Sequence, residues 1–454
     1  MPKPEKYWGW VPEKHPEWKE YLDKWPEWQE RTQKHLASEP FTPYQRVMKQ
    51  LYGDTDLDRV PFATGMGMVT VPSCVKYGVR FCEVHNDPEK MAYSALGTYE
   101  LFGIEAIVVP FDMCFEAEVF GAQMNFYTDT EDILYATVLD KWIEDPDDFD
   151  IPPDWDKKGR VQMVADAITM LKELVGDKVA VGTWNLGPFT AAGQAMDINK
   201  LLIMSFKEPE KCEEILDKFT DLIMLMARKW RMAGADFYCL REPGAAADLL
   251  NPKVFKKLIQ PHLIRILDDQ PSPKVLHICG ETDPIIGFMN ECCADAISVE
   301  QKATPERQRP ILGDDILWFG QFFAWGTLCN DPPEKIEEEI KAEIDYGFNA
   351  IWPSCDLWPD VWPQSMQKLT EVVWFYGKEK GYNFPKPRLC LDRQDELQKI
   401  REEHGDWFAK RQDRLDKYEF PWDLSKIKVF ENRKKPEELF SKGYDVKNSK
   451  MIYK

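Results

Sequence analysis

Short apolar runs that alternate with longer amphipathic stretches place the strongest constraint on the fold of this chain. Eight such runs occur after residue 42, at positions 60–64, 106–111, 179–184, 237–241, 275–279, 296–299, 316–320 and 350–355. Between them lie stretches with apolar residues three and four positions apart, for example 162–175, 209–232, 252–268 and 333–346. Runs that are apolar throughout are typical of parallel strands with both faces covered. The pattern predicts an α/β fold, a (β/α)8 barrel of the TIM type, with a doubly wound open sheet as the alternative.

The ends of the chain differ in composition from this core. Thr42 followed by Pro43 predicts the start of a helix and of the barrel, which we place at residues 41–377. Residues 1–40 form an N-terminal extension rich in aromatic residues, and residues 378–454 form a charged C-terminal extension. We expect the N-terminal aromatics to pack on the barrel or on another subunit, and the C-terminal extension to make homo-oligomer contacts; a disordered tail is the alternative. The acidic insertion at 116–155 is expected near the barrel mouth.

Charge and cysteine usage exclude several classes of protein. The formal net charge of −20 argues against a nucleic-acid partner, because phosphate binding requires clustered Lys and Arg. No run approaches the roughly 18 apolar residues of a membrane span, and the N-terminus shows no apolar signal segment. The 11 cysteines are odd in number and irregularly spaced, unlike a disulfide framework. We therefore expect a cytoplasmic protein with free thiols, no membrane contact and no nucleic acid.

Two of the apolar runs end in side chains that can bind a metal ion. His277 and Cys279 lie two residues apart, so on a strand they face the same side, and Cys355 ends the eighth run. The carboxyl ends of barrel strands meet at one mouth, which brings all three side chains to the same place. One imidazole and two thiolates with a fourth position open is the arrangement of a catalytic Zn²⁺. The alternative is that the cysteines are small core residues and that the histidine binds a backbone carbonyl.

Acidic and aromatic residues at other run ends are further candidates. Glu242 is predicted either to be a displaceable fourth ligand or to hold His277 in place; the alternatives are pairing with Arg241 or capping a helix. Asp112, Glu300 and Asp356 lie at similar positions. Several residues are predicted to project toward the mouth and to form a rim that binds a flat cofactor or substrate. They are Trp184, Asn185, Gln321, Phe322 and the residues after Phe322 up to Trp325. The alternative for these is packing under a loop.

The donor set also indicates the type of chemistry. Two thiolates and a neutral imidazole leave Zn²⁺ with no net charge, which favours binding of a third sulfur as a nucleophilic thiolate. The chain contains no His-Glu-x-x-His pair, no Gly-x-Gly-x-x-Gly fingerprint, no Walker loop and no Gly-x-Ser-x-Gly elbow. A zinc-bound thiolate that acts as a nucleophile is therefore favoured over proteolysis and nucleotide chemistry.

With these residues in place, the stretch from Thr42 to Tyr376 resembles the uroporphyrinogen decarboxylase superfamily, and within it the methylcobamide:coenzyme M methyltransferase branch. The resemblance rests on Thr-Pro-Tyr-Gln-Arg-Val at 42–47, Asp-Arg-Val-Pro at 58–61, Gly-Pro-Phe-Thr at 187–190, His-Ile-Cys-Gly-Glu-Thr-Asp-Pro-Ile at 277–285, Ala-Ile-Ser-Val-Glu-Gln-Lys at 296–302 and the run that ends at Cys355. It implies that His277, Cys279 and Cys355 bind zinc and that zinc activates a thiol. It also implies a corrinoid (methylcobamide) that is supplied by a partner corrinoid protein and donates a methyl group to that small-molecule thiol acceptor.

Two departures from the family pattern leave other functions open. Gly-Gln-Phe-Phe-Ala at 320–324 replaces Gly-Asn-Leu-Asp-Pro, and Pro-Ser-Cys-Asp at 353–356 replaces Pro-Gly-Cys-Gly. The mouth is therefore expected to be bulkier and more aromatic than in the family. The first alternative is an enzyme that demethylates a methoxylated, methylated or halogenated methyl donor onto a corrinoid protein. Weaker alternatives are a tetrapyrrole decarboxylase, whose Arg-rich N-terminal motif is missing, and a non-catalytic barrel that binds a tetrapyrrole or corrinoid.

Overall fold

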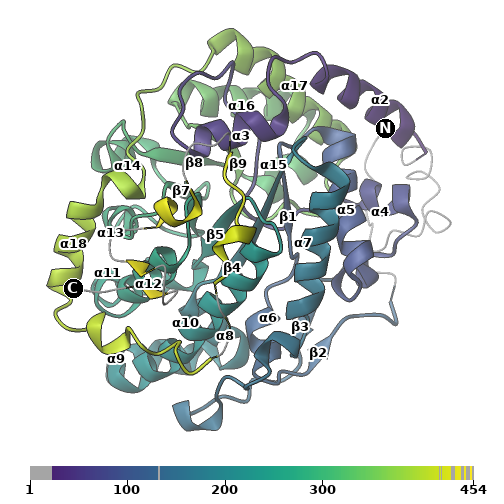
Figure 1. Ribbon diagram of the computed structural model, residues 1–454. Helices are drawn as coiled ribbons and strands as arrows, with labels where there is room; N and C mark the ends of the chain where they lie inside the picture. The colour runs from purple at the N-terminus through teal and green to yellow at the C-terminus, as the bar shows by residue number, and fades with distance from the viewer. Residues whose placement is uncertain are drawn as a thin grey trace.

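A single curled parallel sheet forms the centre of the protein. The computed structural model describes residues 23–130, 133–418, 420, 422–430, 435–440, 444–445 and 450–451. Within these residues seven parallel strands pair in the order β1-β4-β5-β6-β7-β8-β9 (Figure 1). Their bounds are β1 Ala106–Val109, β4 Ala180–Leu186, β5 Phe237–Arg241, β6 Lys274–Ile278, β7 Ala296–Val299, β8 Leu317–Phe322 and β9 Ala350–Pro353. Nearly every residue in them is buried, as expected for a sheet inside a ring of helices.

The run at 60–64 closes the ring without forming a strand of its own, which corrects one of the eight predicted strands. Phe62 makes an isolated parallel bridge to Ile351 of β9. Ile351 N donates to Pro61 O at 2.9 Å, and on the other side Glu105 N donates to Phe62 O at 2.7 Å, just before β1. Pro61 has no N–H to donate, so a regular ladder cannot continue through it. The predicted (β/α)8 barrel is confirmed, and the open doubly wound sheet is excluded.

Helices surround the sheet close to their predicted positions. The helices predicted at 209–232 and 333–346 are α10 and α16, and the one predicted at 252–268 is interrupted by a π turn, Phe255–Ile259. The α-helices of the described residues are α2 Trp25–Leu36, α3 Pro43–Leu51, α4 Val71–Tyr77, α5 Pro88–Phe102, α6 Phe115–Val119, α7 Val161–Val175, α8 Pro188–Ala195, α9 Ile198–Lys207, α10 Pro209–Met232, α11 Pro252–Val254, α12 Gln260–Asp269, α13 Ile286–Glu291, α14 Pro305–Leu312, α15 Ala324–Asn330, α16 Pro333–Tyr346, α17 Pro363–Lys380 and α18 Gln394–Glu403. Short two-stranded ribbons join Met124–Asn125 (β2) to Thr137–Val138 (β3) and Tyr444–Asp445 (β10) to Lys450–Met451 (β11). None of the described helices is both long and apolar enough to cross a membrane.

The described part of the N-terminal extension packs against the barrel. Helix α2 lies beside α5, where Thr32 Oγ1 donates to Leu101 O at 2.8 Å and the rings of Trp28 and Phe102 are 6.1 Å apart. His35 stacks on Trp374 of α17, with ring centroids 3.8 Å apart. The aromatic residues of the first 22 positions lie outside the described residues.

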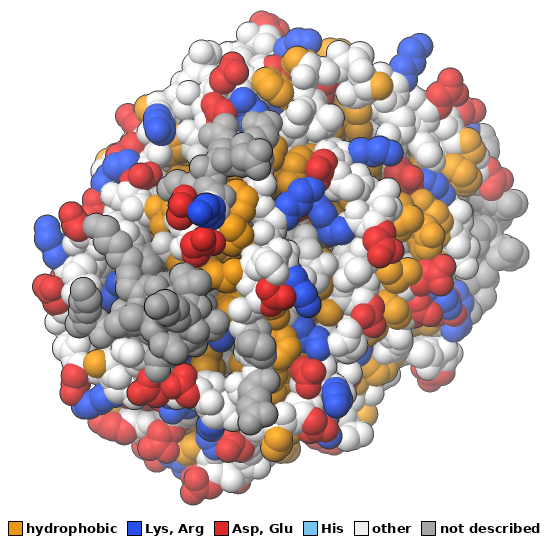
Figure 2. All heavy atoms as spheres, in the orientation of Figure 1, with side chains coloured by type: hydrophobic (Ala, Val, Ile, Leu, Met, Phe, Trp, Pro, Cys, Tyr) orange, Lys and Arg blue, Asp and Glu red, His pale blue; other side chains and the backbone are white. Residues whose placement is uncertain are grey.

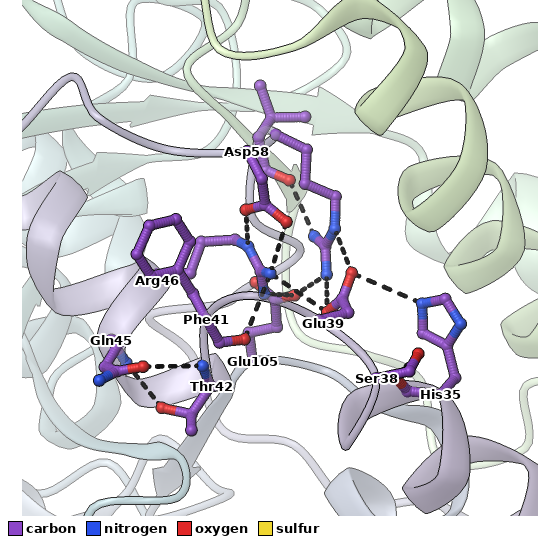
Figure 3. A network of polar contacts seen from close by, with 11 residues as sticks. His35, Ser38, Glu39, Phe41, Thr42, Gln45, Arg46, Asp58 and Glu105 are labelled. Carbon is purple, nitrogen blue, oxygen red and sulfur yellow. Dashed lines mark hydrogen bonds and ion pairs between the residues drawn. The ribbon is translucent and has the colours of Figure 1, made fainter.

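A buried ion cluster joins α2, α3 and the first segment of the barrel (Figure 3). Arg46 binds Asp58 through two hydrogen bonds, of 2.8 and 3.0 Å, and contacts Glu105 at 3.0 Å. Arg59 pairs with Glu39 at 2.8 Å and also contacts Glu105. Buried charges are stable only when paired. The Arg residues of the two N-terminal family motifs therefore serve the structure here.

Basic residues of the C-terminal extension pair with acidic residues on the barrel helices. Arg411 contacts Asp217 at 2.6 Å and Arg414 contacts Asp221 at 2.8 Å, both on α10. Arg401 of α18 forms a buried ion pair with Asp268. These contacts hold the described part of the extension on the barrel.

The same extension covers the amino ends of the strands. Cys390 N donates to Asp295 Oδ1 at 3.0 Å, just before β7, and Ser272 N donates to Leu439 O at 3.0 Å, just before β6. The yellow segment crosses the front of Figure 1, and acidic and basic side chains are interspersed on this face in Figure 2. The opposite end of the sheet, where the strands finish, is left for the site.

Candidate active site

His277, Cys279 and Cys355 meet at the carboxyl ends of β6 and β9. His277 Nε2 lies 2.8 Å from Cys279 Sγ, and Cys279 Sγ lies 3.8 Å from Cys355 Sγ. Gly280, directly after Cys279, has φ +95°, and a Cβ there would lie 2.7 Å from Ala246 Cβ. Glycine is therefore required to turn the chain away from β6 and leave Cys279 facing the mouth.

The imidazole of His277 is held in one orientation. Its Nδ1 lies 2.9 Å from Ser298 Oγ on the neighbouring strand β7, so Nε2 is the nitrogen that faces the thiols. The ring is fully buried, and this burial together with the charge of Arg241 lowers its pKa well below the usual value. A neutral imidazole with one nitrogen fixed and the other turned to two sulfurs has the form of a metal ligand.

A buried guanidinium supports the sulfur of Cys355. Arg241, at the end of β5, donates to Cys355 Sγ at 3.5 Å and binds Asp356 through two hydrogen bonds, of 3.0 and 3.1 Å. Its guanidinium carbon lies 4.4 Å from the ring centre of Trp184. Arg241 is thus enclosed by an anion, a sulfur and an aromatic face, and it compensates negative charge that develops on the thiols.

The two thiols form a hydrogen-bonded pair. The hydrogen bond from Cys279 to Cys355 raises the pKa of Cys279, and burial raises it further. The same bond lowers the pKa of Cys355 against the effect of burial. The pairing thus shifts the pKa values of the two thiols in opposite directions.

Glu242 lies at a helix start rather than among the sulfur atoms. Its carboxylate accepts hydrogen bonds from Phe189 N at 3.0 Å, from Thr190 N at 2.8 Å and from Thr190 Oγ1, all at the beginning of α8. Its own N–H donates to His277 O at 3.0 Å. This is the capping arrangement among the predicted alternatives, and Glu242 reaches His277 only through the backbone.

The residues predicted to form the mouth rim lie at different depths. Trp184 is buried with Nε1 bound to Pro110 O at 2.8 Å, and Asn185 Nδ2 donates to Glu116 Oε1 at 2.8 Å. Phe322 is also buried, 6.2 Å from the ring of Phe62, and Gln321 is half-buried. The structure does not bring these four side chains to the wall of the cavity at the mouth. Their predicted neighbours Phe323, Ala324 and Trp325 line it.

A cavity of about 380 Å³ opens beside Cys355, one of the three candidate metal ligands. Cys355, Asp356 and Glu300 lie in its wall, and Tyr135 reaches it from the insertion at 116–155. Most of the rest of the wall is apolar or aromatic, including Phe111, Met113, Phe323, Ala324, Trp325 and Trp358. The insertion therefore contributes to the mouth, as the sequence predicts.

Sequence reasoning missed two of these residues. From the sequence, pairing with Glu242 is the one role predicted for Arg241, because its contacts to Cys355 and Asp356 join positions more than 100 residues apart. Tyr135 lies in an irregular segment without periodicity. An Arg at a strand end next to a predicted thiolate site was the one available signal for Arg241.

Residues 42–375 match the model of the uroporphyrinogen decarboxylase (URO-D) family. This covers most of the chain and leaves both terminal extensions outside. The chain belongs to the URO-D family, as the motifs at 42–47 and 277–285 predict.

Among the relatives, the methylcobamide:CoM methyltransferase MtaA of Methanosarcina barkeri strain Fusaro is 29% identical over 320 residues, 70% of this chain and 94% of MtaA. The methylated-thiol–coenzyme M methyltransferase of Methanosarcina mazei is 24% identical over 69% of this chain and 84% of its own length. A solved methyltransferase from Methanosarcina mazei superposes with a TM-score of 0.69 at 27% identity, over 73% of this chain and 98% of that one. The predicted resemblance to the methylcobamide:CoM methyltransferase branch is confirmed.

Proposed function

We propose that this protein is a zinc-dependent methyltransferase that moves a methyl group between a corrinoid, carried by a partner protein, and a small substrate in the cavity. The observation that carries the proposal is the convergence of His277, Cys279 and Cys355 at one end of the barrel, where Cys355 also lies in the wall of a cavity. The curated relatives support the corrinoid, since they are named for methylcobamide.

The three side chains suit zinc in type and nearly in spacing. Tetrahedral zinc holds two thiolate sulfurs about 3.8 Å apart and a nitrogen and a sulfur about 3.5 Å apart. The two sulfurs already have this separation, at 3.8 Å, whereas the His277 nitrogen and Cys279 sulfur are at hydrogen-bonding distance, 2.8 Å. No group of three or more His, Cys, Asp or Glu in the described part of the chain has a preformed metal-binding geometry, and at this site the short distance between the His277 nitrogen and the Cys279 sulfur departs from that geometry. Zinc bound to both atoms would replace that hydrogen bond, and the nitrogen and sulfur would then separate to the spacing of the metal site.

The residues of the chain have separate roles in this proposal. Ser298 keeps Nε2 of His277 directed at the ion, and Arg241 balances the charge of Cys355 while Asp356 fixes the guanidinium. The apolar wall excludes water from the reacting atoms. When bound, zinc supplies Lewis acidity, which either activates an acceptor thiol or polarises the leaving atom of a methyl donor.

Metal analysis and a cobalamin assay test the proposal together. Protein purified without added metal is expected to contain about one zinc per chain, because three well-placed ligands bind it tightly. The zinc form is then mixed with methylcobalamin and a panel of thiols, or with cob(I)alamin and a panel of methyl donors, while the cobalamin spectrum is recorded. A spectral change in one of the two directions supports the proposal.

The same assay distinguishes the proposed methyltransferase from the alternative functions. A metal-free protein that leaves both cobalamin forms unchanged with all substrates would overturn the proposal and favour a non-catalytic barrel. Metal-independent release of CO₂ from an acidic tetrapyrrole would favour decarboxylation. Cys212→Ala, in the buried face of α10 and far along the chain from the site, is the matched control for the loss of a cysteine.

A further inference from the structure

A second pair of thiols joins the barrel to the C-terminal extension, near the amino end of the sheet. Cys293 follows helix α13, and Cys390 begins a short 3-10 helix of the extension, Cys390–Asp392. Sγ of Cys293 lies 3.4 Å from Cys390 O and is also hydrogen-bonded to the sulfur of Cys390. Both residues are buried. Two sulfurs in contact need little backbone movement to become a disulfide.

The backbone of Cys293 has an unusual conformation for a residue with a side chain. Its φ is +58°, in the left-handed region where glycine or asparagine usually follows the end of a helix. Helix α13 ends at Glu291, just before this position. The conformation directs the thiol at the extension, and residues held in such conformations often belong to functional sites.

The barrel and the extension both hold Cys390 opposite this thiol. Cys390 N donates to Asp295 Oδ1 at 3.0 Å, and Lys274 N fixes the same carboxylate through Oδ2 at 2.9 Å. Gln394 Nε2 donates to Cys390 O at 2.7 Å and lies 3.4 Å from its sulfur. Because these contacts already bring the two sulfurs together, the entropy cost of closing the long loop between them is met by the fold.

A buried cation lies beside the pair. Lys274 Nζ donates to two backbone carbonyls, Leu267 O at 2.6 Å and Gln270 O at 3.3 Å. The thiol–thiol hydrogen bond and burial raise the pKa of Cys293, whereas the same bond lowers the pKa of Cys390 against the effect of burial. The charge of Lys274 lowers both pKa values. It therefore stabilises a thiolate at either sulfur, and the thiolate is the form that reacts with oxidants.

A cavity gives small molecules access to the pair. It has a volume of about 290 Å³ and lies between α13 and α18, and its wall includes Cys293, Asn290, Arg393, Leu397 and Ile400. A water molecule occupies about 30 Å³ in the liquid, so a small hydroperoxide such as hydrogen peroxide fits inside.

We propose that Cys293 and Cys390 form a redox site, which reacts with a hydroperoxide to give a reversible disulfide between the barrel and the C-terminal extension. One sulfur, as its thiolate, attacks an oxygen of hydrogen peroxide; the O–O bond breaks, a sulfenic acid forms, and the first water leaves with the proton of that thiol. The other sulfur then attacks the sulfenic sulfur, the S–O bond breaks, and a second water carries away the hydroxyl group and the remaining thiol proton. Two thiols are thus oxidised to one disulfide while one peroxide is reduced to two waters. A dithiol reverses the oxidation by thiol–disulfide exchange.

The disulfide would fasten the extension across the amino ends of the strands. It joins positions 97 residues apart. In a reducing compartment such a bond is transient and reports oxidation. It involves neither the cavity at the mouth nor the proposed zinc ligands, so this inference and the proposed function are tested independently.

Peptide mapping tests the site directly. The reduced full chain is treated with hydrogen peroxide, the remaining thiols are alkylated, and tryptic peptides are identified by mass spectrometry. Trypsin releases Cys390 in peptide 389–393 and Cys293 in peptide 275–302, which also contains Cys279 and Cys292. We expect the cross-link between these two peptides to form at least about tenfold faster than any other, because these thiols are in contact beside a cation. A disulfide between Cys279 and Cys355 would instead join 275–302 to 342–368 and is counted separately.

The adjacent cysteine provides a matched control. Cys293→Ser and Cys390→Ser should each abolish the cross-link, whereas Cys292→Ala should keep it, since Cys292 Sγ donates to Phe288 O at 3.3 Å instead. Oxidised wild type should unfold about 5 °C above the reduced protein, because the bond restricts the unfolded chain. Dithiothreitol should reverse this shift, and the two serine variants should not show it.

The mapping of the wild type alone can overturn the inference, even where a serine variant fails to fold. Absence of the cross-link between 275–302 and 389–393, or its formation only after denaturant is added, would show that the two thiols are inert core residues. An undiminished cross-link in Cys293→Ser would likewise exclude Cys293 as the partner of Cys390.

Discussion

Nη2 of Arg241 lies 3.5 Å from Sγ of Cys355, so a buried guanidinium directly contacts one of the three proposed zinc ligands. The same guanidinium holds Asp356, the next residue along the chain, through both carboxylate oxygens. The position of Cys355 is therefore determined from β5 as well as from its own strand, β9.

Arg241→Met should remove this support. Asp356 would be left without its cation in a largely buried position, so we expect the free energy of unfolding to fall by about 3 kcal/mol. Asp356→Asn in the same chain should recover part of that loss, and a double-mutant cycle by urea denaturation measures the coupling. A coupling energy close to zero would show that the pair contributes little.

Cys279→Ala and Cys355→Ala should each lose the metal while the protein stays folded. With two ligands left, zinc content measured by plasma emission should fall from about one per chain to about one tenth or less, and methyl transfer should be lost. Circular dichroism should be unchanged, as it should be for the control Cys212→Ala, which retains zinc. Retained turnover in either of the first two variants contradicts the proposed site.

Glu242→Gln separates a capping role from a metal-binding role. The amide would turn a donor toward the N–H groups of Phe189 and Thr190, so we expect a loss of about 1–2 kcal/mol in unfolding free energy. Zinc content should remain unchanged, because the carboxylate is bound at the start of α8. A Gln variant that loses zinc at unchanged stability would restore Glu242 as a ligand.

Glu39 gives the chain a measurable acid sensitivity. Burial alone would raise the pKa of Glu39, but the contact with His35 and the charges of Arg59 and Arg46 lower it from 4.5 to about 2. A lowered pKa in the folded state stabilises the protein above the unfolded value, and that stability is lost as the pH falls toward the folded value. The shift corresponds to about 3 kcal/mol.

The comparison of wild type with Glu39→Gln isolates this effect. Their difference in unfolding free energy should be full above about pH 4.5 and should shrink steadily between pH 4.5 and about 2. Glu27→Gln, at an exposed position of α2, is the control for the substitution itself. A difference that is constant with pH would rule out the charge contribution.

Local patterns predicted the barrel and the convergence of its strand ends. His277, Cys279 and Cys355 could be placed together from the sequence because strand ends in a barrel share one face. Phe322 was assigned to the rim because β8 was expected to end at residue 320; the strand continues to Phe322, and the side chain at 322 is buried in the core. The positions of this segment that line the cavity are therefore 323, 324 and 325.

Long-range ion pairs were beyond prediction from the sequence. Arg241 and Asp356 are 115 positions apart, and Arg46 and Glu105 are 59 apart, so no local signal joins them. For Glu242 the sequence left four roles open, because a carboxylate after a strand serves a cap as well as a metal. The zinc, the corrinoid partner, the cytoplasmic location and the oligomer contacts of the extensions stay predictions.

The isolated bridge between Phe62 and Ile351 has a mechanical consequence. Neighbouring strands elsewhere in the ring pair through regular ladders of hydrogen bonds. The short segment at 60–64, in contrast, is held between β9 and β1 by only a few backbone hydrogen bonds on either side. Local opening of the barrel is expected first at this junction, so the amide hydrogens of Phe62 and Ala63 should exchange with deuterium before those of β5 or β6. This junction adjoins β9, so the strand that leads to Cys355 is the one best able to move when a large planar reactant enters the mouth.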